Sequence, residues 1–199
     1  MGTKTTTADE MNKEPNMDAP FLSPIENPED EDLKQIYRYM QEQFGKVVTP
    51  VKVHSARLPL AFLEWATKIN QLDRMLQLPA QTALLIRGQV ARLNICLFCI
   101  DASRYATMQV YKNEAKFDAL DKYRTSPLFT DAERAALDYA TELTKEKKIN
   151  PATFARLTCY YSERQICEIV YLIASEHVYN LSNIGLNIHS DMLCKIPQK

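Results

Sequence analysis

The chain has 199 residues, of which 46% are hydrophobic, so it can bury one good core and is only slightly longer than a typical single domain. Lysine and arginine total 24 against 25 for aspartate and glutamate, which leaves no overall field to attract nucleic acid or an anionic membrane. Five cysteines are an odd number in a chain apolar enough to fold without disulfides, so the composition argues against a secreted disulfide scaffold and favours a reducing compartment.

The amino-terminal segment is polar and is interrupted by prolines. It lacks the apolar stretch of a secretory signal, and no later stretch approaches the length of a membrane span. We therefore predict a flexible polar tail over residues 1–28, a single domain over residues 29–199 and a cytoplasmic location without a membrane partner.

The first half of the domain carries apolar residues at helical spacing, which predicts helices over about 30–44, 59–75, 79–93 and 97–111. The acidic run at 29–32 suits a helix amino end, and Gly45 is a natural stop. Residues 47–53 are expected to form an extended linker, Trp65 a core anchor, and Asn94 the break between the third and fourth helices.

The second half continues the helical pattern. Thr130 with Glu133 resembles a capping box, and Ser162 opens the last long helix in the same way. We predict helices over about 116–123, 130–143, a short stretch from 150, and 162–179. With only four glycines and no alternating strand pattern, the chain is expected to be all-α.

Cys96 and Cys99 form a CxxC at the predicted start of the fourth helix. Two thiols at that spacing can close a small ring, and a helix amino end lowers the pKa of at least one of them. This makes thiol–disulfide chemistry the first hypothesis. Ser103, one turn later, has a hydroxyl that can orient a thiolate or a bound oxygen but cannot act as a base near neutral pH.

Three blocks of the chain, at 90–99, 127–140 and 162–183, resemble the carboxymuconolactone decarboxylase and alkyl hydroperoxidase D superfamily. The likeness covers most of residues 35–190. It implies a compact multi-helix domain that assembles as a homotrimer or hexamer. It also implies that Cys99 attacks a hydroperoxide, that Cys96 closes the disulfide, and that a dithiol donor such as a lipoyl domain restores the pair.

The chain departs from the family at both positions of its proton relay. Peroxidase-like members carry a glutamate twelve residues before the first cysteine, where this chain has Leu84, and a histidine four residues after the second, where it has Ser103. Of the three histidines, His54, His177 and His189, we select His177 as the first candidate for a substitute base.

Five other polar residues lie near the CxxC in the sequence. Arg87, Arg92 and Arg104 are the candidate cations for a thiolate, and each is expected to face solvent. Gln89 is a candidate orienter that projects towards the dithiol. Asp101 is expected to serve the helix dipole.

The remaining cysteines, Cys159, Cys167 and Cys194, have no paired spacing and are taken as core or incidental residues. The CxxC with His189 and Cys194 makes a formal set of four zinc ligands, but a second close pair is missing. We expect no metal and no cofactor.

Two functions remain open from the sequence. The first is a thiol-dependent peroxidase or disulfide oxidoreductase that uses the CxxC, a small hydroperoxide or disulfide substrate and a dithiol electron donor. The alternative is a catalytically silent helical oligomer that binds a ligand or a partner, which Leu84 and Ser103 favour. No nucleic-acid partner is expected.

Overall fold

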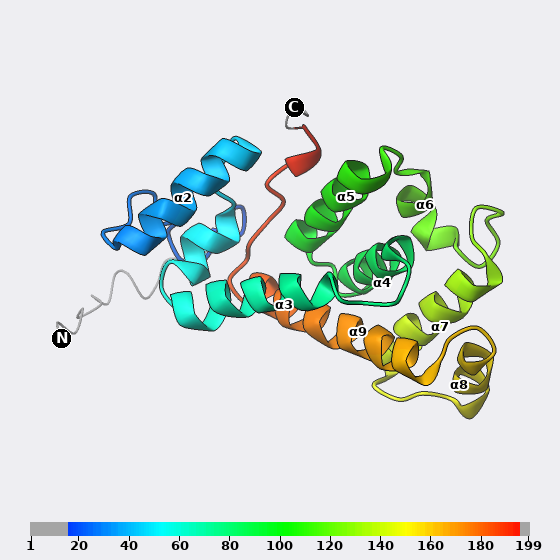
Figure 1. Ribbon diagram of the computed structural model, residues 1–199. Helices are drawn as coiled ribbons and strands as arrows, with labels where there is room; N and C mark the ends of the chain where they lie inside the picture. Colours follow the sequence, from blue (N-terminus) through cyan, green and yellow to red (C-terminus); the bar gives the residue numbers. More distant parts are fainter. Residues whose placement is uncertain (1–15, 196–199) are drawn as a thin grey trace, which may run out of the picture.

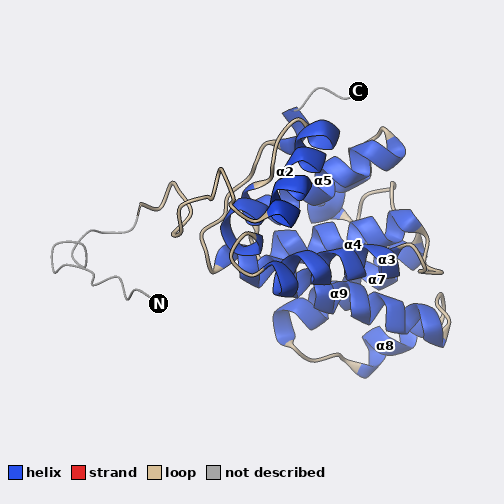
Figure 2. Ribbon diagram, turned by 60° about the vertical axis from the view of Figure 1, so that its left-hand side comes forward, coloured by secondary structure: helices blue, strands red, loops and turns tan. Residues whose placement is uncertain are grey.

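The computed structural model describes residues 16–195, and every regular element in that range is a helix (Figures 1 and 2). The prediction of an all-α domain is therefore confirmed. None of these helices is both long and apolar enough to cross a membrane. The α-helices are α2 (Glu31–Phe44), α3 (Trp65–Asp73), α4 (Ala80–Leu93), α5 (Leu97–Tyr111), α6 (Ala115–Asp118), α7 (Asp131–Glu146), α8 (Pro151–Thr158) and α9 (Glu163–Ile184).

Helix α4 lies at the centre of the domain, between α5 on one side and α9 on the other, and α7 packs against a third side (Figure 1). The main core joins Ile86 and Val90 of α4 to Ala136 and Ala140 of α7 and to Ile169 of α9, all of them buried. Within α4 and within α7 these residues are spaced four apart, so each pair forms one apolar face.

Gly88 allows α6 to approach α4 closely. A Cβ at this position would lie 2.5 Å from Cε2 of Phe117, a ring that is itself fully buried. A larger residue would therefore force the ring out of its site. The close approach fixes one side of α4.

The predicted helix ends are confirmed where local chemistry determines them. Asp30 accepts a hydrogen bond from the backbone N–H of Leu33 at 2.9 Å, and Gly45 ends α2 with φ 72°. Thr130 and Ser162 each complete a capping box at the start of α7 and α9.

Two predicted segments differ from the structure. Residues 47–53 were expected to be extended, but the chain turns into a short π-helix over Val51–Ser55, because Pro50 already has helical φ and alternate valines bury themselves. Helix α9 continues five residues beyond the predicted end to Ile184. That last turn carries Asn183 into the domain interior.

Residues 1–15 of the predicted tail lie outside the described part of the chain. Residues 16–28 contain no helix, yet backbone hydrogen bonds hold them against the domain. The N–H of Phe21 donates to Leu186 O at 3.0 Å, and the N–H of Ile25 donates to Lys52 O at 2.9 Å. The Tyr37 hydroxyl donates to Ile25 O at 2.7 Å. This stretch therefore covers the region between α2 and the carboxyl end of α9.

Candidate active site

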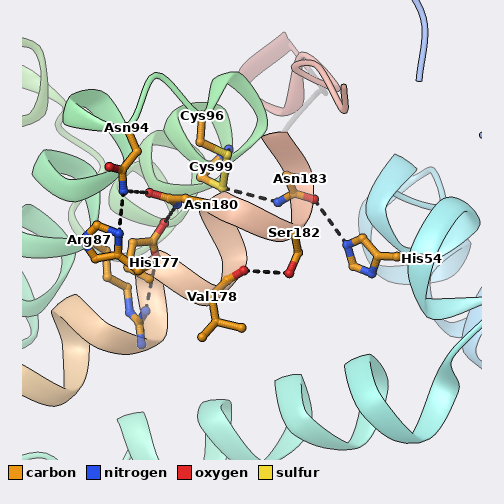
Figure 3. Close-up of a disulfide and its surroundings, with 11 residues drawn as sticks. His54, Arg87, Asn94, Cys96, Cys99, His177, Val178, Asn180, Ser182 and Asn183 are labelled. Carbon is orange, nitrogen blue, oxygen red and sulfur yellow. Dashed lines mark hydrogen bonds and ion pairs between the residues drawn. A yellow bond between two sulfur atoms is a disulfide. The ribbon is translucent and has the colours of Figure 1, made fainter. Parts of the chain in front are cut away.

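The turn between α4 and α5 places both cysteines at the amino end of α5 (Figure 3). Ile95 adopts a left-handed backbone with φ 57°, so the chain reverses and Cys96 caps α5. The N–H of Cys99 donates to Cys96 Sγ at 3.4 Å, and a disulfide joins the two residues. Both are buried, with exposures of 1% and 4%. The sulfurs therefore lie at the positive end of the α5 dipole.

A pocket of about 660 Å³ opens beside Cys99, between α3, α4, α5 and α9. One face of α5 lines it with mostly small side chains, which leaves room for a ligand: Cys99, Ala102, Ser103, Ala106 and Val110. Cys99 belongs to this lining, whereas Cys96 does not. Apolar walls with a few converging polar groups are typical of a small-molecule site.

Helix α9 supplies a polar group directly to the sulfur. Asn183 is 3% exposed, and its Nδ2 donates to Cys99 Sγ at 3.4 Å. Its Oδ1 lies 3.3 Å from Nε2 of His54 (Figure 3). His54 Nδ1 lies 3.3 Å from the Ser55 hydroxyl. The His54 tautomer with its proton on Nε2 satisfies both contacts and holds the Asn183 N–H towards the sulfur.

His54 comes from the π-helix over Val51–Ser55 and stacks against Phe62 with ring centroids 4.2 Å apart. Burial lowers its pKa, and the hydrogen bond with Asn183 opposes that effect only in part. A lowered pKa favours the neutral imidazole near pH 7, whose Nε2–H donates to the amide oxygen.

Glu176 is the buried carboxylic acid of the same pocket, with 4% exposure. Asn180 Nδ2 donates to its Oε1 at 2.7 Å, and Arg87 donates to its Oε2 at 3.2 Å. Burial raises the pKa of Glu176 to about 7, against the opposing effects of Arg87 and Asn180, and the charge of Asp73 adds to the rise. The group is therefore partly protonated at neutral pH.

Arg87 was expected to face solvent, and this expectation is wrong. Its side chain is 11% exposed and lies between two carboxylates, Asp73 at 2.8 Å and Glu176 at 3.2 Å. Desolvation opposes the charge of the guanidinium, but the two carboxylates outweigh it and raise the arginine pKa. The two carboxylates explain its inward position, because a buried charge is costly unless it is paired.

The other two candidate cations are engaged away from the cysteines. Arg92 donates to Phe117 O at 2.9 Å and lies over the Phe117 ring. Arg104 pairs with Glu114 at 2.8 Å and with Asp118 at 3.3 Å. Neither lines the pocket.

The structure places the predicted site residues in two groups. Ser103, 8% exposed, and Leu84 both line the pocket, so the two family relay positions do face the site. His177 lies elsewhere: its Nδ1 is 3.1 Å from Asn94 Nδ2, on the turn before the cysteines, and it is absent from the pocket lining. Burial and the charge of Lys147 lower the pKa of His177.

Two further interpretations are corrected by the contacts. Gln89 points to α7, where its Nε2 donates to Thr141 Oγ1 at 3.0 Å, and does not reach the dithiol. Asp101 Oδ2 accepts hydrogen bonds from the Ser190 hydroxyl and the Leu193 N–H, each at 2.9 Å. Its carboxylate therefore anchors the carboxyl-terminal segment to α5, because both donors reach it from that segment.

The structure also places the remaining cysteines and the aromatic anchor. Cys159, Cys167 and Cys194 are all exposed, so of the two predicted roles, core or incidental, the core role is excluded. Within residues 16–195 no three metal-ligating side chains form a group that fits a metal ion, so the zinc set considered from sequence is not assembled. Trp65 is half-buried and packs edge-on against Tyr179, with ring centroids 4.5 Å apart, beside the pocket.

The sequence motifs did not indicate Glu176, Asn183 or His54 as site residues. A usable signal was present, since Glu176, Tyr179 and Asn183 are spaced three and four residues apart along one helix. Polar residues at that spacing share one face, and such a face is expected to be buried with its neighbours.

Comparisons with known proteins agree with this architecture. No family model matches the chain. The uncharacterized protein YnjA of Escherichia coli (strain K12) is 26% identical over 161 residues, which cover 80% of this chain and 88% of that protein. The crystal structure of the debrominase Bmp8 superposes with a TM-score of 0.74 at 21% identity, covering 86% of this chain and 92% of Bmp8.

A further solved structure decides the fold. An alkylhydroperoxidase AhpD core, from an uncharacterized peroxidase-related protein of Ralstonia eutropha, superposes with a TM-score of 0.74 at 19% identity, covering 88% of this chain and 97% of that one. The chain has the alkyl hydroperoxidase D fold. The resemblance drawn from the sequence blocks is thus confirmed for the fold. Within this alkyl hydroperoxidase D fold, the polar groups around Cys99 come from α9 and the π-helix.

Proposed function

We propose that this chain is a thiol-dependent peroxidase or disulfide oxidoreductase in which Cys99 attacks the substrate and Cys96 resolves the product. The placement of the two sulfurs carries the proposal. Cys99 lines the pocket, whereas Cys96 lies behind it with 1% exposure. A substrate in the pocket therefore meets Cys99 first, and Cys96 is within disulfide distance of the oxidised sulfur.

The reaction balances with the groups at the site and one external dithiol. The Cys99 thiolate attacks the terminal oxygen of a hydroperoxide, an S–O bond forms, and the O–O bond breaks to give a sulfenic acid and an alkoxide, which takes up one proton and leaves as an alcohol. The Cys96 thiol then displaces the sulfenic oxygen as water and forms the disulfide. A dithiol donor reduces that disulfide by exchange and is itself oxidised to a disulfide.

Two features support the thiolate form of Cys99. The sulfur lies at the amino end of a fifteen-residue helix, where the dipole favours negative charge. The Asn183 amide donates to it at 3.4 Å. Hydrogen bonds to the charged form of a group lower its pKa, so both contacts favour attack at neutral pH.

The experiment is a thiol count on the purified, reduced chain before and after cumene hydroperoxide, followed by a mass map of the paired cysteines. We expect two thiols lost per chain as a Cys96–Cys99 bond, restored by dihydrolipoamide. Cys99→Ser should consume no peroxide, and Cys159→Ser, an exposed cysteine away from the pocket, is the matched control. A wild-type rate in Cys99→Ser would overturn the proposal.

Reductive dehalogenation is a second candidate for the same cysteine pair. Bmp8 is a debrominase, and a cysteine-to-alanine variant of it was crystallised with 2,3,4-tribromopyrrole. The pocket beside Cys99 is lined by two aromatic rings, Phe98 and Tyr179, that suit a flat halogenated ring. Bromide release from a bromopyrrole by the reduced chain would support this candidate. A cysteine pair that stays reduced with both cumene hydroperoxide and the bromopyrrole would instead support a catalytically silent protein that binds a ligand or a partner.

We also infer that the working form is a homotrimer or hexamer. Large apolar side chains surround the turn that carries the cysteines: Ile95 is 73% exposed, Leu97 46% and Leu181 65%. Contiguous exposed apolar residues are typical of interaction surfaces. Light scattering on the wild type and on Leu181→Glu tests this inference, and the variant should dissociate.

A further inference from the structure

Glu176 is a buried acid in the pocket of Cys99 that the reaction described above does not use. It shares one face of α9 with Asn183, seven residues further on, and Asn183 contacts the Cys99 sulfur. Cys99, Glu176 and Asn183 all line the same pocket, so a substrate held there meets both the sulfur and the carboxyl group.

The hydrogen bonds to Glu176 leave a proton free to face the pocket. Asn180 donates to one carboxyl oxygen and Arg87 to the other. Each oxygen of a carboxyl group has two acceptor positions, so one remains on each oxygen after these bonds. Because Glu176 itself lines the pocket, a proton on either oxygen can be donated into it.

The charges around Glu176 favour such a proton. The charged or titratable groups that face it are Arg87 on α4, Asp73 on α3 and the hydroxyl of Tyr179 on α9 itself. The Tyr171 hydroxyl donates to Asp73 at 2.9 Å. Asp73 already forms two hydrogen bonds with Arg87, at 2.8 and 3.0 Å. One cation therefore faces two carboxyl groups, of which Glu176 is buried, and a proton on Glu176 removes the excess negative charge.

We propose that Glu176 is a catalytic acid that protonates the leaving oxygen when Cys99 attacks a hydroperoxide. The Cys99 sulfur gains the terminal oxygen, the O–O bond breaks, and the alkoxide that leaves takes its proton from Glu176 and departs as an alcohol. Glu176 regains a proton from solvent after the alcohol leaves. The inference rests on the proposed peroxidase function and assigns to α9 the acid that Leu84 cannot supply from α4.

The test compares two oxidants whose leaving groups differ. An alkoxide leaving from cumene hydroperoxide is strongly basic and needs a proton, whereas the acetate leaving from peracetic acid does not. Glu176→Gln should therefore slow oxidation of Cys99 by cumene hydroperoxide about 100-fold, within the range of general acid catalysis, and leave the rate with peracetic acid within about twofold. The normal rate with peracetic acid shows at the same time that the variant is folded.

Glu168→Gln is the matched control. Glu168 is a buried glutamate of the same helix, 7% exposed, that accepts from the Gln77 and Leu78 N–H groups and does not line this pocket. Its replacement should leave the rate per folded molecule with both oxidants unchanged. With cumene hydroperoxide the wild-type rate should also fall above pH 7, and this fall should be absent from Glu176→Gln.

The outcomes separate the inference from the proposed function. Equal slowing with both oxidants, or no slowing with either, overturns the role of Glu176 while leaving the cysteine chemistry in place. A wild-type chain whose Cys99 reacts with neither oxidant overturns the proposed function itself, and the acid role with it.

Discussion

The amino end of α5 and the inner face of α9 meet at Cys99, and they are built in opposite ways. The cysteines, the turn at Ile95 and the cap of α5 all lie within a few residues of one another. The contacts from α9 join positions far apart in sequence, such as Asn183 with Cys99, 84 residues away. The nucleophile is thus a local feature, while the groups that control its protonation arrive by tertiary packing.

Helix α9 itself shows how strongly packing decides protonation. Glu168 and Glu176 lie two turns apart, and both are less than 10% exposed. Burial would raise the pKa of Glu168, but the Gln77 and Leu78 N–H groups and Arg164 outweigh it and lower the pKa. Glu176 is more deeply enclosed and has fewer donors, so burial prevails and its pKa rises to about 7. Only the group without sufficient donors is suited to proton transfer.

The largest effect is expected at the amino end of α5. Cys99→Ser should abolish peroxide consumption, while Cys96→Ser should complete one attack and stop at a sulfenic acid on Cys99, because only the resolving thiol is missing. Stopped-flow mixing with one equivalent of cumene hydroperoxide, followed by dimedone trapping, measures this difference. Sustained turnover by Cys96→Ser would contradict the assigned roles.

The next largest effect is expected at Glu176 on the inner face of α9, where the stability of the fold should depend on pH. The pKa of Glu176 is raised from 4.5 to about 7 on folding, so the folded chain holds a proton that the unfolded chain releases. This stabilisation is fully present below the unfolded pKa and is lost as pH rises through the folded pKa. Urea unfolding should therefore show wild type losing about 3 kcal/mol relative to Glu176→Gln between pH 4 and pH 8.

A difference between wild type and Glu176→Gln that stays constant with pH would show that Glu176 does not titrate on folding in this range. Glu168→Gln provides the opposite sign, since the pKa of Glu168 is lowered. The free energy of unfolding of the wild type should therefore increase relative to that of Glu168→Gln as pH rises through the acidic range.

Asn183 tests the contact between the two regions. Asn183→Ala removes the N–H donor to Cys99 Sγ, so the pKa of the reduced thiol should rise by about one unit, in keeping with a hydrogen bond to a charged group. The pH dependence of Cys99 alkylation in a Cys96→Ser background measures this. Asn187→Ala is the control, because Asn187 binds the carbonyls of Met17 and Ala19. Equal pKa values of the Cys99 thiol in Asn183→Ala and Asn187→Ala would show that Asn183 does not stabilise the thiolate.

The smallest effect is expected at His54, which acts through Asn183. His54→Leu removes the group that orients the amide, so Cys99 alkylation at pH 7 should slow about threefold, as for the loss of part of a hydrogen bond. His54→Gln keeps an N–H at a similar reach and should restore most of the rate. A Gln variant as slow as the Leu variant would mean that His54 only fills space.

The sequence by itself determined most of the elements and the position of the cysteine pair. Helical periodicity, two capping boxes and a glycine stop give most helix ends, because each depends on residues within one turn. The CxxC placed its two cysteines at a helix start for the same reason. The missing partners at Leu84 and Ser103 were also visible, since their positions follow directly from the motif spacing.

Only the tertiary structure decided which groups serve that pair. Arg87 turns inward because it pairs with two carboxylates, Asp73 and the buried Glu176. His54 reaches the site because residues 51–55 form a π-helix, and Asn183 does so because α9 runs one turn further than its apolar pattern. Each depends on burial and charge balance between segments distant in sequence. Desolvation depends on how the whole domain packs. The raised pKa of Glu176, and its proposed role as the acid of this pocket, therefore cannot be predicted from the neighbouring residues in the sequence.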